Sequence, residues 1–131
     1  MPSSAAMADG NRTMGSLYDL IPAPKTKHVN PIGEWNQARI LAQGRHVTFW
    51  LNGEKTVEFE RGSPTWRKLV VDSKYKVWPG FGELPEGHIL LQDHGNEVFF
   101  RNIKIRVIPK PERAANRLFV LLPPLLKEQP V

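Results

Sequence analysis

The chain has 131 residues, 40% of them hydrophobic, which is enough for one domain with a modest core but not for two. It contains no cysteine, which excludes disulfides, thiolate metal sites and cysteine nucleophiles. Its 18 basic and 13 acidic residues give a net charge of +5, but the basic residues are scattered rather than gathered into a stripe, so we do not expect a nucleic acid partner.

Neither end of the chain has a clear targeting or membrane signal. Residues 1–15 lack the apolar core of a signal peptide. The C-terminal apolar run, residues 118–126, is too short to cross a bilayer and is interrupted by Pro123 and Pro124. We therefore expect no membrane partner, a disordered segment over residues 1–14 and a separate tail over residues 109–131.

Residues 35–60 have the pattern of a three-stranded antiparallel meander. Asn52-Gly53 predicts a tight hairpin, because a type I′ turn requires positive φ at both central positions. Gln43-Gly44 predicts a second turn, back to a strand over residues 35–42. Alternation then places two sets of side chains on opposite faces of the sheet: Val47, Phe49, Leu51, Val57 and Phe59 on one, and His46, Thr48, Trp50, Glu58 and Glu60 on the other.

A short helix is predicted over residues 64–74. Ser63 is a typical N-cap, Pro64 suits the first helical position, and Trp66, Leu69 and Val70 fall on one helical face. The following residues, 76–87, are rich in glycine and proline and predict an irregular loop.

Two further strands are predicted over residues 89–92 and 98–108, on either side of the sequence QDHGN. Five strands joined by short turns, with one helical insertion, indicate an all-β fold, either an antiparallel β-sandwich or a jelly-roll.

The segment around His94 permits two interpretations. Asp93 and Gly95 are favoured turn residues, which would leave His94 exposed at a loop tip. Alternatively, Asp93 orients the His94 imidazole as a general acid or base. Arg101 shares the predicted strand face with apolar residues, so it either pairs with a carboxylate such as Asp93 or stabilises an oxyanion. The other histidines have no metal-ligand spacing to His94, so no metal site is expected.

Aromatic residues raise a similar choice. Trp35 at the start of a strand is consistent with core or rim packing, but it could also stack on a sugar ring, with Asn36 binding a hydroxyl. Tyr18-Asp19, before a proline-rich connector, could lie over such a site. The pattern alone leaves both interpretations open.

Four sequence segments occur in an informative order: GSLYDLIP, GEWNQARILAQGRHVTFWLNG, DSKY and GHILLQDHGNEVFFRNIKI. Together they resemble the 3-keto-disaccharide hydrolase family over residues 15–108. The resemblance implies a concanavalin-like jelly-roll of two antiparallel sheets, partial here because family domains are longer and their opening half has no counterpart. Family members are usually exported bacterial proteins, although no signal peptide is recognisable in this chain.

The resemblance also implies a reaction, the cleavage of glycosidic bonds in sugars oxidised to a ketone at C3, with no cofactor. On this hypothesis His94 is the base or acid, Asp93 orients it, and Arg101 stabilises the enolate. The residues expected to position the carbohydrate are Gln92, Trp35, Asn36, Asn102, Lys74 and Tyr18.

Two alternatives to catalysis remain. The chain could be a non-catalytic, lectin-like carbohydrate-binding module, since the same architecture serves both purposes, or an inactive truncated fragment. Because a partial jelly-roll leaves sheet edges uncovered, a complementary half-domain or a second copy of the chain is a further predicted partner.

Overall fold

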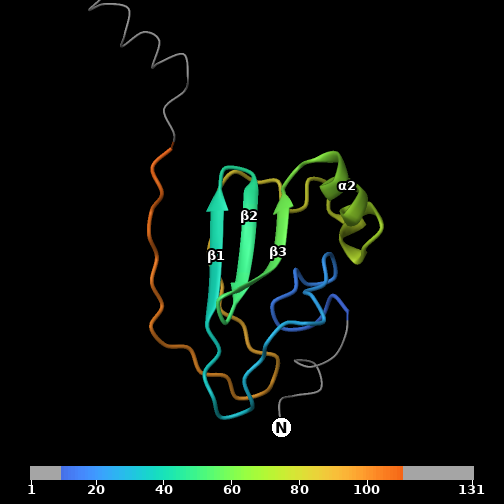
Figure 1. Cartoon of the computed structure of the whole chain (residues 1–131). Helices are drawn as coiled ribbons and strands as arrows, with labels where there is room; N and C mark the ends of the chain where they lie inside the picture. The colour runs from blue at the N-terminus through green and yellow to red at the C-terminus, as the bar shows by residue number, and fades with distance from the viewer. Residues whose placement is uncertain (1–9, 111–131) are drawn as a thin grey trace, which may run out of the picture. The chain divides into compact units, whose positions relative to one another are not determined.

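The computed structural model describes residues 10–110. Strands β1 (Ala38–Gln43), β2 (His46–Leu51) and β3 (Glu54–Glu60) form an antiparallel sheet in the order β1-β2-β3, followed by helix α2 (Pro64–Val71) and the 3-10 helix η1 (Lys74–Val77) (Figure 1). The chain divides after Leu91 into two compact units, and these elements all belong to the first. The antiparallel β-architecture with one helix agrees with the predicted partial jelly-roll.

The predicted hairpin between β2 and β3 is confirmed. Asn52 and Gly53 both have positive φ, at 49° and 83°. The pairing of Val47 with Phe59 and of Phe49 with Val57 places the apolar side chains on one face, as the alternation predicted. The register shifts between Phe49 and Trp50, so β3 carries an irregularity opposite this point.

Strand β1 begins three residues later than the predicted strand over residues 35–42 and ends at Gln43. The residues that precede it bond to the hairpin turn instead of extending the ladder. The Gln37 N–H donates to the Asn52 side-chain oxygen at 2.8 Å, and the Asn52 N–H donates to the Gln37 carbonyl, also at 2.8 Å.

Helix α2 begins as predicted, with the Ser63 hydroxyl accepting a hydrogen bond from the Trp66 N–H at 3.1 Å. It ends at Val71 and not near residue 74. The Ser73 hydroxyl accepts from the Tyr75 N–H at 3.1 Å and so caps η1. A capped 3-10 turn therefore takes the place of the last predicted helical turn.

The main hydrophobic cluster joins the helix to the chain before the sheet. Leu20, Trp66 and Val70 are buried in it. Phe59 from β3 stacks on Trp66 with 5.1 Å between ring centroids, and the Trp66 indole N–H donates to the Phe81 carbonyl at 3.0 Å. Gly82 lies so close to the Trp66 ring that a Cβ at this position would overlap it.

Residues 10–14, which the sequence placed in a disordered segment, make defined contacts. The Thr13 side chain is buried and donates to the Gly10 carbonyl. Ser16 continues the same structure by accepting a hydrogen bond from the Ala23 N–H at 2.8 Å. Residues 1–9 and 111–131, with most of the predicted tail, lie outside the described residues.

The two strands predicted over residues 89–92 and 98–108 are wrong as elements, since the structure assigns no strand between residues 61 and 110. The apolar alternation is present, but a strand also needs a paired neighbour. Asn102 has φ of 55°, which interrupts the extended backbone and with it the regular alternation of faces. Apolar side chains of this segment are exposed, namely Phe99, Ile103, Ile105 and Val107.

Within residues 10–110, no helix combines the length and the hydropathy needed to cross a bilayer.

Candidate functional site

The residues predicted to form the site fall in both units of the chain. Tyr18, Trp35, Asn36 and Lys74 belong to the first unit, and the segment that begins at Gln92 belongs to the second. The assembly of these two groups into a single site stays a prediction.

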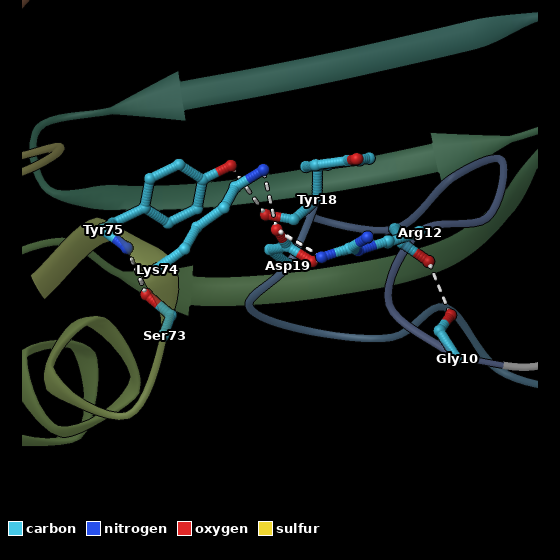
Figure 2. Close-up of polar contacts among 8 residues, drawn as sticks. Gly10, Arg12, Tyr18, Asp19, Ser73, Lys74 and Tyr75 are labelled. Carbon is cyan, nitrogen blue, oxygen red and sulfur yellow. Dashed lines mark hydrogen bonds and ion pairs between the residues drawn. The ribbon is translucent and has the colours of Figure 1, made fainter.

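Asp19 is the centre of an ionic cluster (Figure 2). Its carboxylate accepts hydrogen bonds from the Arg12 guanidinium and pairs with the Lys74 ammonium, whose Nζ lies 2.8 Å from Oδ2. The Asp19 side chain is only 9% exposed. The hydrogen bond from Arg12, followed by the one from Lys74, lowers the pKa of Asp19, and the same contacts raise the pKa values of Arg12 and Lys74.

Tyr18 lies between the two cations of this cluster. The Lys74 Nζ is 4.6 Å from the centre of the Tyr18 ring and the Arg12 Cζ is 5.6 Å from it. The Tyr75 hydroxyl donates to the Tyr18 carbonyl at 3.4 Å, which ties the N-terminal loop to η1 (Figure 2). Lys74, predicted to position a hydroxyl, is thus engaged with Asp19 and the Tyr18 ring, whereas Tyr18 is 49% exposed.

Arg12 was not predicted to be a site residue, and Asp19 was named only together with Tyr18, as a residue that could lie over a sugar site, without its ion pairs. One signal was available, because Asp19 is the single acidic residue between positions 10 and 33, in a stretch that also contains Arg12, Lys25 and Lys27. An acid that is isolated among cations is a natural centre for ion pairs.

Asn36 joins the GEWN segment to the hairpin turn. Its side-chain oxygen accepts hydrogen bonds from the Asn30 N–H at 2.8 Å and from the Asn52 Nδ2 at 2.9 Å. Asn30 in turn donates through Nδ2 to the Trp35 carbonyl at 2.7 Å. The oxygen of Asn36 is therefore occupied by two donors, and only its amide nitrogen is left to bind a sugar hydroxyl. The neighbouring Trp35 side chain is 45% exposed.

A hollow of about 300 Å³ lies next to this turn, lined by Gln37, Arg39, Trp50 and Gly53. Arg39 pairs with Trp50 across β1 and β2, and the Arg39 Cζ lies 4.7 Å from the centre of the Trp50 ring. The alternation had placed Trp50 on the polar face of the sheet, but neither Arg39 nor Gln37 was singled out.

The same polar face carries a histidine–carboxylate contact. The His46 Nε2 lies 2.7 Å from Glu58 Oε1, and the Lys55 Nζ lies 2.5 Å from Glu58 Oε2. The hydrogen bond from Lys55, followed by the one from His46, lowers the pKa of Glu58. All three side chains are about half exposed.

In the second unit, the turn interpretation of QDHGN is confirmed at two positions. Asp93 Oδ1 accepts a hydrogen bond from the Gly95 N–H at 3.1 Å, and Gly95 has φ of 85°. His94 and Arg101 are exposed, as are Gln92 and Asn102. One Asp93 oxygen is thus used by the turn, and the catalytic roles of Asp93, His94 and Arg101 stay predictions.

Histidine and carboxylate side chains do not gather in groups of three or more suited to a metal ion in the part of the chain that the structure describes.

Comparison with known proteins places these features in a family context. Residues 2–106 match the 3-keto-alpha-glucoside-1,2-lyase-like domain. A 3-keto-disaccharide hydrolase of Bacteroides thetaiotaomicron is 38% identical over an alignment of 117 residues, and the match covers 82% of this chain and 40% of that protein. The chain therefore spans less than half of the curated relative that it matches.

A crystal structure from Parabacteroides distasonis, described as a "putative glycosyl hydrolase", is 36% identical with a TM-score of 0.48, covering 53% of this chain and 31% of that one.

Proposed function

Because the chain belongs to the 3-keto-alpha-glucoside-1,2-lyase-like domain family, we propose that it takes part in cleaving the glycosidic bonds of sugars that carry a ketone at C3. The observation that supports this most directly is the 38% identity to a 3-keto-disaccharide hydrolase over most of the chain. Because the chain covers only part of that relative, the activity is a proposal for this chain.

The C3 ketone determines the chemistry. It acidifies the C2–H bond, so that a base can remove this proton to give an enolate. The enolate expels the glycosidic oxygen from C1, a C1–C2 double bond forms, and the leaving oxygen takes up a proton from an acid. Water then adds across the double bond, with its hydroxyl on C1 and its proton on C2. The sum is hydrolysis of the glycoside.

In this scheme His94 is the base that removes the C2 proton and Asp93 orients its imidazole. The second oxygen of Asp93 is available for this purpose, since the first accepts the Gly95 N–H. Arg101 stabilises the negative charge that develops on the C3 oxygen. A cation stabilises a transition state most when it is already positioned beside the atom on which the negative charge develops. An imidazole is suited to such a task because it titrates near neutral pH.

The substrate is positioned by the remaining polar and aromatic side chains. Tyr18 offers an exposed ring held between two cations, and the Asn36 amide nitrogen can donate to a hydroxyl. We propose the same positioning role for Trp35, Gln92 and Asn102. Lys74 acts indirectly, because its ammonium is held by Asp19 beside Tyr18.

The test uses the full chain and a chromogenic aryl 3-keto-α-glucoside. We expect release of the aryl alcohol, a loss of about 10²-fold or more in His94→Ala, and an unchanged rate in His88→Ala, a control with an exposed histidine six residues earlier. Full activity in folded His94→Ala contradicts the assignment of the base. Saturable binding without turnover in the unsubstituted chain supports the second candidate, a carbohydrate-binding module. Absence of both contradicts the proposed function.

A further inference from the structure

We propose that the hollow between Gln37, Arg39, Trp50 and Gly53 is a saccharide subsite that prefers a sugar ring carrying a carboxylate. That the ligand is a saccharide rests on the proposed function. Its acidic character is inferred from the hollow itself.

The hollow has the size of a small-ligand site. Its volume of about 300 Å³ is at the lower end of the range for small-molecule pockets, so it suits one ring rather than several. Gly53 keeps one side open, since no atom lies within 4 Å of the place where a Cβ would stand.

The walls of the hollow are held in place by the hairpin turn. The Gln37 N–H donates to the Asn52 side-chain oxygen, and the Asn52 Nδ2 donates to the His28 carbonyl and to Asn36 Oδ1, both at 2.9 Å. Arg39 and Trp50 are directly paired across β1 and β2. A ligand therefore meets side chains that project from paired backbone, which reduces the entropy lost on binding.

Arg39 supplies the preference for an acid. Within residues 10–110 its guanidinium forms no ion pair, and its Cζ lies over the Trp50 ring, 4.7 Å from the ring centre. The carboxylate of Glu58 on the same face is already held by Lys55 and His46. A guanidinium stacked on an aromatic ring keeps its N–H donors at its edge, where a carboxylate can accept two parallel hydrogen bonds.

Trp50 supplies the apolar surface. Its indole is half-buried on the face of the sheet that also carries Thr48 and His46, and Gln37 lines the same hollow. Indole combines a large apolar surface with limited conformational freedom, so it offers contact area to the C–H groups of a sugar ring at low entropic cost. Gln37 can both donate to and accept from ring hydroxyls.

The subsite is tested by titrating the full chain with methyl β-D-glucuronide and with methyl β-D-glucoside, using heteronuclear NMR. We expect the glucuronide to cause saturable shifts of the Trp50 indole signal. The glucoside should bind at least about tenfold more weakly, because it lacks the carboxylate that forms a charge-assisted hydrogen bond with Arg39. Arg39→Gln should weaken glucuronide binding about tenfold, and Arg39→Lys should weaken it by less.

Arg45→Gln is the matched control, since it removes the same charge from the opposite end of the same β1–β2 hairpin and should leave the affinity within twofold. Equal affinity for the two glycosides, equal effects of Arg39→Gln and Arg45→Gln, or absence of saturable binding to the folded chain overturns the proposal. Cleavage of a neutral 3-keto-α-glucoside by the unsubstituted chain is measured in parallel, so failure of the subsite and failure of the proposed function are observed separately.

Discussion

Replacing Asn52 tests how the GEWN segment is attached to the hairpin. The Asn52 side chain makes three hydrogen bonds, with the Gln37 N–H, the His28 carbonyl and Asn36 Oδ1. Its backbone has φ of 49°, a conformation that glycine adopts without steric cost and alanine does not. Asn52→Gly therefore removes the three bonds while leaving the turn conformation accessible, and Asn52→Ala removes the bonds and adds backbone strain.

The expected magnitudes follow from these contacts. Three partly exposed hydrogen bonds at about 0.5 kcal/mol each give about 1.5 kcal/mol, and the greater freedom of glycine in the unfolded chain adds about 0.5 kcal/mol. We expect Asn52→Gly to lower the free energy of unfolding by about 2 kcal/mol. Asn52→Ala should lower the free energy of unfolding by about 3 kcal/mol. It loses the same three hydrogen bonds, and backbone strain of about 1–2 kcal/mol replaces the entropic cost of glycine.

Urea unfolding of the full chain, followed by tryptophan fluorescence, measures both differences. Asn52→Gly should also weaken glucuronide binding in the hollow, because the Gln37 N–H loses its acceptor. A free energy of unfolding for Asn52→Gly within about 0.5 kcal/mol of the unsubstituted chain refutes the view that these three bonds hold the segment in place.

Two further predictions concern the core and the ionic cluster. Gly82→Ala should lower the free energy of unfolding by about 2–4 kcal/mol, since it combines positive-φ strain with overlap of the Trp66 ring. Gly80→Ala has a similar φ of 71°, but its Cβ would meet only Glu83 Oε2 at an ordinary contact distance of 3.8 Å, so it should lower the free energy of unfolding by only about 1 kcal/mol in the same urea assay. Equal effects at the two glycines contradict the overlap. Because the folded pKa of Asp19 lies below its ordinary value of 3.8, its ion pairs stabilise the fold above that pH, and this stabilisation is lost as the pH falls through the lowered folded pKa. Stability measured between pH 5 and pH 2 should therefore fall more steeply in the unsubstituted chain than in Asp19→Asn, and identical slopes contradict this assignment.

Local sequence signals predicted the first unit well. Asn52-Gly53 determines its turn through backbone conformation alone, and Ser63-Pro64 determines a helix start through capping alone. Both signals act over a few residues, so they can be read without knowledge of the rest of the fold. The faces of β2 and β3 followed from alternation for the same reason.

The misses involve contacts between distant residues. The ion pair of Lys74 with Asp19 joins positions 55 residues apart, and no local pattern reveals such a partner. The strand over residues 98–108 was predicted from alternation, but a strand also requires a neighbour, and the left-handed backbone at Asn102 follows from no periodicity. The sequence likewise did not predict that the Asn36 side-chain oxygen accepts a hydrogen bond from the hairpin turn, because the two donors to this oxygen belong to other segments of the chain.

The proposed chemistry is tested most directly by cleaving a 3-keto-α-glucoside with the full chain in D₂O and measuring deuterium at C2 of the released sugar by mass spectrometry. If His94 removes the C2 proton and a solvent proton is then added back, the enzymatic product should carry one deuterium at C2. This label is counted above the background exchange of the free 3-keto sugar in the same buffer. His94→Ala should lose both the cleavage and the label. Cleavage with no deuterium above that background would contradict the elimination mechanism and the role given to His94.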